Sequence, residues 1–202
     1  MTVIVKQPTI VAFDFDGTLT RGESFFHFLW FVTPWWRFAW CFLRCVPVLV
    51  AYVARLMSND RAKARVISIF LRGQSREKLE QLSRDFASKG IPKSLRPEAM
   101  ARLRHHQKQG HHCVLVSATL ALYLRPWAEL HEFEHVIATE LACDGQGRLT
   151  GVMSTPNCYG PQKAVRLKAH FGVDHIFAAY GDSSGDTEML AMAEQPFYRP
   201  WH

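Results

Sequence analysis

The chain has 202 residues, of which 48% are hydrophobic and 21% charged, and its formal net charge is +6. A chain of this length and composition can bury a large hydrophobic core, which excludes a disordered, collagen-like or coiled-coil protein. The charge is uneven, because residues 58–110 contain 13 Lys and Arg against 5 Asp and Glu, whereas residues 111–202 contain 6 against 10. The sequence therefore predicts one basic and one acidic surface.

The cysteines and the N-terminal residues indicate a cytoplasmic protein. The five cysteines are odd in number and form no CxxC pair, as is typical of reduced thiols in that compartment. Residues 1–17 run from a short apolar stretch into an acidic motif without an A-x-A-like cleavage site, so no secretory signal is expected.

Short β-branched and aromatic runs alternate with helical patterns along most of the chain. The expected strands cover residues 9–13, 113–116, 136–139 and 176–180. The expected helices between them cover residues 97–109, 120–130 and 162–171. This alternation predicts an α/β, Rossmann-like core with a parallel sheet. Residues 141–154 have a turn-rich centre that predicts a β-hairpin.

Residues 21–94 do not alternate in this way and have helical patterns throughout. An aromatic block extends to residue 57, and helices are expected over residues 60–71 and 75–89, with Ser75 as an N-cap. We therefore predict an all-helical cap domain, residues 21–94, inserted into a core formed by residues 1–20 and 95–202.

The aromatic block contains ten of the 25 aromatic residues, all between Phe25 and Phe42. Arginines and prolines interrupt it too often for a typical membrane-spanning helix, which needs roughly 20 consecutive apolar residues. These interruptions are Arg37, Arg44, Arg55, Pro34 and Pro47. Two interpretations remain open: a buried helical core, or a helix pair lying on the inner face of a membrane, with the arginines at the headgroups.

Acidic pairs follow two of the expected strands. Asp14 and Asp16 come directly after residues 9–13, and Asp182 and Asp186 follow residues 176–180. The carboxyl ends of parallel strands are where ligands bind in such sheets. Two acidic pairs there form an oxygen-rich site suited to Mg²⁺.

Hydroxyl and ammonium groups complete the expected site. Ser117 and Thr119 follow a third strand, and Lys163 opens a helix. Donors that face a metal ion suit a phosphoryl group, because its negative charge must be neutralised during transfer.

The runs VAFDFDGTLT and VLVSAT, followed by Lys163 and YGDSSGDTEML, resemble the four ordered motifs of the haloacid dehalogenase-like (HAD) hydrolase superfamily. A helical cap between the first two motifs is similar to that of subfamily IB, the phosphoserine-phosphatase-like branch. The resemblance covers nearly the whole chain and implies a Mg²⁺-dependent phosphomonoester hydrolase.

The resemblance also assigns roles to the acidic residues. It makes Asp14 the nucleophile that becomes an aspartyl-phosphate, and Asp16 the general acid and base. Mg²⁺ would be held by Asp14, the main-chain carbonyl of Asp16 and Asp182. Asp186 would act through water or orient the site.

The remaining site residues would bind the substrate. The resemblance assigns the phosphoryl oxygens to Ser117 and Lys163, with Thr18 as a helper. Glu23 and Arg65 match positions that bind the amino and carboxylate groups of the substrate in phosphoserine phosphatases.

The substrate expected from the cap differs from phosphoserine. Ala118, Thr119 and Gly185 depart from the phosphoserine phosphatase motifs, and the aromatic cap resembles subfamily IB members such as the phosphatidylglycerophosphatase C type. We therefore expect an apolar or lipid phosphomonoester such as phosphatidylglycerophosphate. The alternative is a small soluble metabolite such as phosphoserine or histidinol phosphate. The same residues would also serve a phosphotransferase.

Two other classes of protein have weaker support. Residues 131–135 read HEFEH, a zinc-protease pattern that requires both histidines on one helix, whereas a strand is expected to begin there. The basic segment could serve a nucleic-acid- or lipid-binding module without catalysis. Its basic residues have helical spacing without interleaved aromatics, so no nucleic-acid partner is expected.

Overall fold

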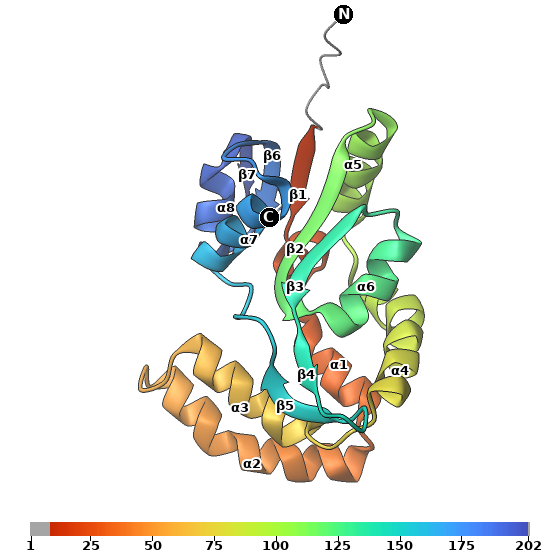
Figure 1. Ribbon diagram of the computed structural model, residues 1–202, viewed down its shortest axis with the longest axis vertical. Coiled ribbons are helices and arrows are strands. Elements are labelled where there is room, and N and C mark those ends of the chain that lie inside the picture. The colour runs from red at the N-terminus through yellow and green to blue at the C-terminus, as the bar shows by residue number, and fades with distance from the viewer. Residues whose placement is uncertain (1–8, 202) are drawn as a thin grey trace, which may run out of the picture.

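The computed structural model describes residues 9–201. Within these residues, five parallel strands form a sheet in the order β3-β2-β1-β6-β7, which confirms the expected α/β, Rossmann-like fold (Figure 1). The strands are β1 (Ile10–Phe13), β2 (His112–Leu120), β3 (His135–Thr139), β6 (Ile176–Gly181) and β7 (Ala193–Tyr198).

The central strand β1 is buried along its whole length, because helices cover both faces of the sheet. Val11 and Phe13 pack in the same cluster as residues of α5 (Pro97–Lys108) and α6 (Ala121–Leu130). Ile10 and Ala12 point the other way and pack with residues of α7 (Pro161–Phe171) and α8 (Thr187–Ala191). The sheet thus fixes the position of the residues that follow β1 and β6.

The edge strand β7 has no counterpart among the expected elements. It pairs in parallel with β6, with Ile176 opposite Ala193. All six of its residues are exposed or half-buried, and it contains Pro196. An edge strand with a proline lacks the continuous apolar run by which buried strands are recognised.

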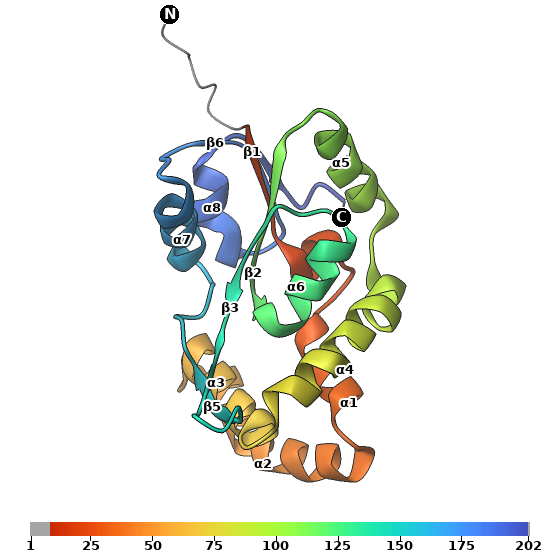
Figure 2. The same ribbon diagram turned by 45° about the vertical axis from the view of Figure 1, so that its right-hand side comes forward.

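The segment between β1 and α5 is helical, as expected. Its helices are α1 (Ser24–Val32), α2 (Trp35–Val53), α3 (Asn59–Leu71) and α4 (Arg76–Lys89) (Figure 2). The Ser75 hydroxyl caps α4 by accepting from the amide of Lys78. The two ends of the segment lie side by side, where the amide of Arg21 donates to the carbonyl of Ser94. The domain boundaries at residues 20 and 95 stay a prediction. Residues 1–8, with the expected absence of a secretory signal, lie outside the described part of the chain.

The expected hairpin is formed by β4 (Leu141–Cys143) and β5 (Leu149–Met153), and it lies beside α3 in Figures 1 and 2. The amide of Gly73, just after α3, donates to the carbonyl of Leu149 over 2.7 Å. A Cβ atom on Gly151 would lie 3.0 Å from the Cα atom of Ser68. The hairpin therefore packs against the helical segment.

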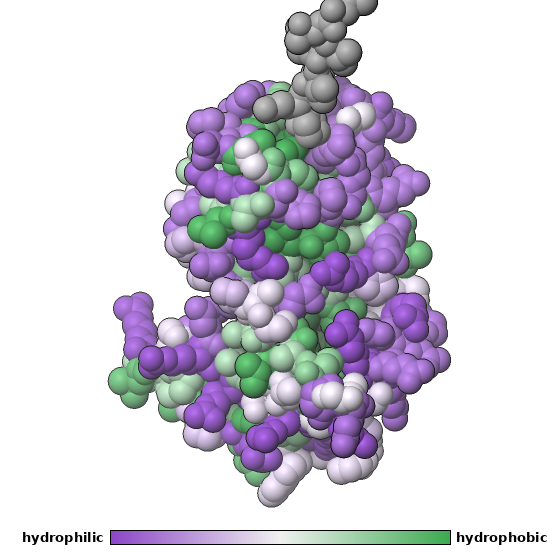
Figure 3. All heavy atoms as spheres, viewed as in Figure 1, coloured by the Kyte–Doolittle hydropathy of each residue, from purple (hydrophilic) through white to green (hydrophobic). Residues whose placement is uncertain are grey.

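The aromatic block is mostly exposed, which contradicts the interpretation as a buried helical core. Among its ten aromatic side chains only Phe28 is buried, and Phe25 and Phe38 are partly buried. The other seven are exposed: Phe26, Trp30, Phe31, Trp35, Trp36, Trp40 and Phe42. In the space-filling view, green and pale residues lie among purple ones over the lower half of the molecule (Figure 3).

Candidate active site

Three aspartates meet at the carboxyl ends of β1 and β6. Asp14 follows β1, Asp182 follows β6, and Asp186 lies in the short turn after it. One carboxylate oxygen from each of the three lies within 4.8 Å of the others. The sheet brings together what the sequence predicted, since β1 and β6 are neighbours.

The backbone after β1 is shaped to let Asp182 approach. Gly17 has a φ of +79°, which disfavours any residue with a side chain. A Cβ atom at this position would lie 2.2 Å from Oδ2 of Asp182. Glycine at this position therefore keeps the loop and the second acidic pair in contact.

Lys163 forms ion pairs with two of the three aspartates. Its Nζ atom donates to Oδ1 of Asp14 and to Oδ1 of Asp186, each over 2.5 Å, and all three side chains are buried. Burial raises the pKa of Asp14 to about 8, and the Lys163 ammonium opposes this rise. Burial alone would lower the pKa of Lys163, but the two carboxylates outweigh it and raise the pKa above its ordinary value.

The carboxylate of Asp186 is fully engaged by donors. Oδ1 accepts from Lys163, and Oδ2 accepts from the amides of Asp182 and Ser183 and from the Ser183 hydroxyl. Asp186 therefore orients the turn after β6, while one of its oxygens stays within the group of three that could hold a metal ion. The carboxylates of Asp14 and Asp182 provide the hard oxygen donors that Mg²⁺ prefers, so the donor set fits this ion.

Asp16 has a different environment from Asp14. Its Oδ1 accepts from the amide of Ser24 at the start of α1 over 2.8 Å. Burial, and then the nearby Glu23 carboxylate, raise the pKa of Asp16 to about 7. A carboxyl group with such a pKa can be protonated near neutral pH, as a general acid requires.

The two predicted phosphate-binding hydroxyls differ in position. Ser117 is buried, lines the active-site cavity, and its Oγ accepts from the amide of Thr119 over 3.2 Å. Thr18 is also buried, but its hydroxyl donates to Oδ2 of Asp14 over 3.3 Å. Thr18 is not among the residues that line the cavity, so its visible role is to hold the Asp14 carboxylate.

A cavity of about 330 Å³ opens over these residues, between the ends of the strands and the helical segment. Its polar side contains Asp14, Asp16, Ser117, Lys163 and Asp182. Its apolar side is formed by Phe25, Phe26, Leu49, Ala62 and Val66 from α1, α2 and α3, which also contribute the polar groups of Tyr52, Asn59 and Lys63. The cavity can therefore hold a phosphate at one side and an apolar group at the other.

Of the two predicted substrate-binding residues, Glu23 lines this cavity and Arg65 does not. Arg65 is exposed on α3, whereas Lys63 on the same helix reaches into the cavity. Residues two positions apart point to nearly opposite sides of a helix, which explains the difference. The cation that the cap supplies to the cavity is thus Lys63, which corrects the assignment to Arg65.

Lys63 connects the helical segment to the core. Its ammonium donates to the carbonyl of Ala118 at the end of β2 and, over 2.9 Å, to Oδ1 of Asn157. Burial lowers the pKa of Lys63 to about 8, and the nearby Asp16 carboxylate opposes this change. Neither Lys63 nor the buried Asn157 is among the residues predicted from the sequence.

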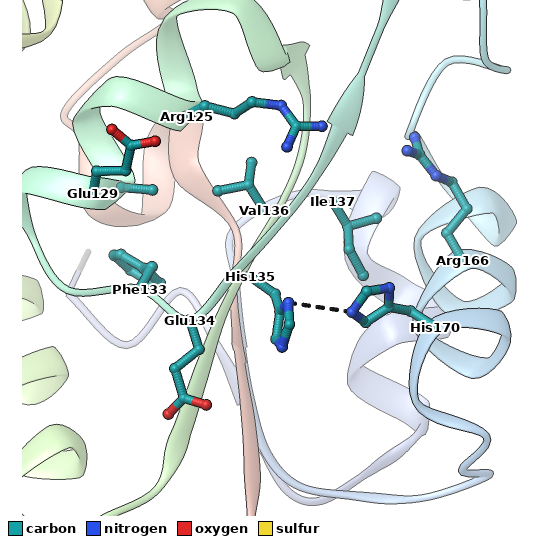
Figure 4. A pocket seen from close by; sticks show the side chains of 10 residues that line it. Arg125, Glu129, Phe133, Glu134, His135, Val136, Ile137, Arg166 and His170 are labelled. Atoms are coloured by element: carbon teal, nitrogen blue, oxygen red, sulfur yellow. Dashed lines mark hydrogen bonds between the residues drawn. The ribbon is translucent and has the colours of Figure 1, made fainter.

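A second cavity, of about 420 Å³, lies between the end of α6, β3 and α7, away from the aspartates (Figure 4). There His135 points toward His170, with their ring nitrogens 3.2 Å apart. His131 follows the end of α6, whereas His135 begins β3. The HEFEH pattern is therefore not on one helix, which contradicts the zinc-protease interpretation.

Comparison with known proteins identifies the family. A family model described as haloacid dehalogenase-like hydrolase matches residues 11–191, which include every residue of the active-site cavity. The chain belongs to this family. As a HAD-like hydrolase it is an enzyme, and the alternative of a binding module without catalysis is excluded.

Among its relatives, this HAD-like hydrolase is 41% identical to the protein CicA of Caulobacter vibrioides, over 96% of this chain and 86% of the relative. A structure of unknown function from Bordetella pertussis Tohama I has a TM-score of 0.75 at 23% identity, covering 92% of this chain and 87% of that one. A substrate-bound phosphoserine phosphatase has a TM-score of 0.65 at 18% identity, covering 93% and 84%. These two likenesses show the shared fold. The resemblance to the HAD-like hydrolases is thus confirmed, and membership of subfamily IB and of the phosphatidylglycerophosphatase C type stays a prediction.

Proposed function

We propose that this HAD-like hydrolase is a Mg²⁺-dependent phosphomonoester hydrolase that forms an aspartyl-phosphate on Asp14. The observation that carries the proposal is the position of Asp14, which lies at the end of β1, hydrogen-bonded to Lys163 and within 4.8 Å of the Asp182 carboxylate. Bound between these carboxylates, Mg²⁺ would neutralise charge on the phosphoryl oxygens and hold them for in-line attack.

The first chemical step forms a bond between an oxygen of Asp14 and phosphorus, while the ester bond to the leaving oxygen breaks. Lys163 and Thr18 hold the Asp14 carboxylate in place for this attack. Asp16 donates its proton to the leaving oxygen, so the dephosphorylated product leaves as an alcohol.

The second step releases phosphate. Asp16, now ionised, takes a proton from water as the water oxygen attacks phosphorus. The bond between phosphorus and Asp14 then breaks, which regenerates the Asp14 carboxylate. Ser117 lines the polar side of the cavity and is suited to bind a phosphoryl oxygen in both steps.

The substrate we favour is a phosphomonoester with an apolar or lipid part. The apolar side of the cavity supports this choice, because Phe25, Leu49 and Val66 offer no partner to a polar leaving group. A lipid such as phosphatidylglycerophosphate combines a terminal phosphate with an apolar part.

A small amino-acid phosphate is the second candidate. Glu23 and Lys63 both line the cavity and carry opposite charges, which could bind the amino and carboxylate groups of such a substrate.

A panel of phosphate-release assays with Mg²⁺ tests the proposal. Phosphoserine and histidinol phosphate would be compared with phosphatidylglycerophosphate in micelles, using the parent, Asp14→Asn and, as a matched control, Asp174→Asn at an exposed site. We expect release by the parent and the control but not by Asp14→Asn, with the fastest release from the micellar lipid. Equal rates for Asp14→Asn and the parent would contradict the mechanism. Soluble esters that react orders of magnitude faster than the lipid would contradict the substrate class.

A further inference from the structure

One side of α2 is apolar along its whole length and faces away from the protein. The exposed residues recur at three- and four-residue intervals, so they share one side of the helix. This apolar stripe consists of Trp35, Phe42, Leu43, Val46, Val50 and Val53, whose exposed fractions range from 41% to 80%. Trp36 and Trp40, each 62% exposed, border it. Soluble proteins rarely leave a continuous apolar surface of this kind uncovered.

The opposite side of α2 packs against α3. Cys41 and Cys45 are buried there, and the Cys41 thiol donates to the carbonyl of Ile69 on α3. The Arg37 guanidinium donates to the carbonyl of Phe70, also on α3. α2 forms the lower edge of the molecule in both ribbon views (Figures 1 and 2). The packing of α2 on α3 therefore leaves the apolar stripe facing solvent.

The composition around the apolar stripe suits the surface of an anionic bilayer. No acidic residue occurs between Glu23 and Asp60, and the exposed Arg44 and Arg55 lie on α2 and just after it. The segment also contains four of the chain's six tryptophans, all of them exposed. Tryptophan is enriched at the boundary between lipid and water, and arginine binds lipid phosphates there.

We propose that α2 lies flat on an anionic membrane, with the apolar stripe in the acyl region and Arg44 and Arg55 at the headgroups. α2 is long and apolar enough to cross a membrane by length and composition alone. A spanning helix would have to expose Cys41 and Cys45 to lipid and break their packing on α3, whereas a helix lying on the surface keeps both. The absence of acidic residues also favours a lipid surface over a second copy of this chain, because the same basic face would meet itself.

Membrane binding would place the active-site cavity close to the lipid. Leu49 and Tyr52 line the cavity from α2, the same helix that carries the apolar stripe. A helix is about 10 Å across, so the cavity wall lies about that far from the bilayer. A lipid phosphomonoester could then reach Asp14 while its acyl chains stay near the membrane. This last step rests on the proposed function, whereas membrane binding itself does not.

Flotation of the full chain with lipid vesicles tests the proposal. The vesicles would contain either phosphatidylcholine alone or phosphatidylcholine with phosphatidylglycerol. We expect the parent and Asp14→Asn to float equally with the anionic vesicles, and less with the neutral ones. Arg44→Gln should lower the partition coefficient for anionic vesicles about fivefold, since each well-placed charge contributes about that factor.

A pair of double variants separates the apolar stripe from general surface hydrophobicity. Leu43→Glu with Val50→Glu changes the stripe, and Val152→Glu with Val165→Glu changes two valines outside α1 to α4, which are 59% and 53% exposed. We expect the stripe variant to lose about tenfold or more in partitioning and the control variant to lose none. Both should retain phosphate release from a soluble phosphomonoester, which separates this proposal from the proposed function.

Four outcomes would overturn the proposal. The first is the absence of flotation with either kind of vesicle, and the second is an equal loss of partitioning in the control variant. The third is that alkaline carbonate fails to extract the bound protein from the vesicles. The fourth is a stable dimer in sedimentation that dissociates only in the stripe variant. The last two would indicate a spanning helix and an interface between copies of the chain.

Discussion

The Nζ atom of Lys163 lies 2.5 Å from Oδ1 of Asp14, although the two residues are 149 positions apart and their side chains are 3% and 7% exposed. A buried carboxylate beside two others would be unfavourable without a cation. The lysine that would bind the phosphoryl group thus also permits the acidic residues to be buried together.

Replacing Lys163 should therefore affect stability as well as activity. Lys163→Met leaves the Asp14 and Asp186 carboxylates without their shared cation, and we expect a loss of about 3–5 kcal/mol in the free energy of unfolding. Lys168→Met, on the same helix, removes an exposed ion pair with Asp174 and should cost less than about 1 kcal/mol. Urea denaturation of both variants measures the difference, and equal losses would contradict a neutralising role for Lys163.

Gly17 offers a test of how closely the loop must approach Asp182. Gly17→Ala would force its Cβ atom against the Asp182 carboxylate and should lower phosphate release by about 100-fold, since displaced catalytic groups lose about this factor. Gly147→Ala is the matched control, because its φ is also positive, at +70°, but its Cβ atom would meet nothing within 4 Å. Both variants carry similar backbone strain, so a comparable loss of activity in Gly147→Ala would show that strain alone is responsible.

Lys63 should bind the substrate as a cation. We expect Lys63→Met to raise KM about tenfold or more with a smaller change in kcat, and Arg65→Met, on the opposite side of α3, to change neither. The pKa of Lys63 is lowered to about 8, so the ammonium is present below that pH and is lost above it. KM of the parent should therefore rise as the pH passes about 8. Lys63→Arg should remove this rise, and a pH profile that is unchanged in Lys63→Arg would exclude Lys63 as its source.

Mg²⁺ binding should be measurable without any assay of activity. A ligand at 100 times its Kd adds about 2.7 kcal/mol of stability, so Mg²⁺ should raise the Tm of the parent. Asp182→Asn removes a ligand and should abolish most of this increase, whereas Asp174→Asn, at an exposed site, should keep it. A Tm that does not respond to Mg²⁺ in the parent would contradict the metal site.

The aspartate cluster was predictable because strand ends in a parallel sheet meet at one edge. Local runs of apolar residues located β1 and β6, and Asp14 and Asp182 follow directly. Lys63 could also have been found from its spacing. It lies three, four and seven residues before the buried Val66, Ile67 and Phe70, which places it on the inner side of α3.

Other features depend on contacts that local patterns do not contain. The hairpin lies against α3 through backbone hydrogen bonds between residues about 75 positions apart, such as those of Gly73 and Leu149. In α2 the apolar stripe is exposed and Arg37 lies on the side packed on α3, so periodicity would favour the wrong side as the buried one. The choice between a core helix and a surface helix therefore required the packing of Cys41 and Cys45 on α3.

The most direct test of the central claim is to locate the phosphoryl group during turnover. The parent would be mixed with a phosphomonoester and Mg²⁺, quenched in acid, digested and analysed by mass spectrometry. We predict one phosphorylated aspartate, Asp14, and no phosphorylated peptide in Asp14→Asn. A phosphoryl group on another residue, or full phosphate release by Asp14→Asn, would contradict the account.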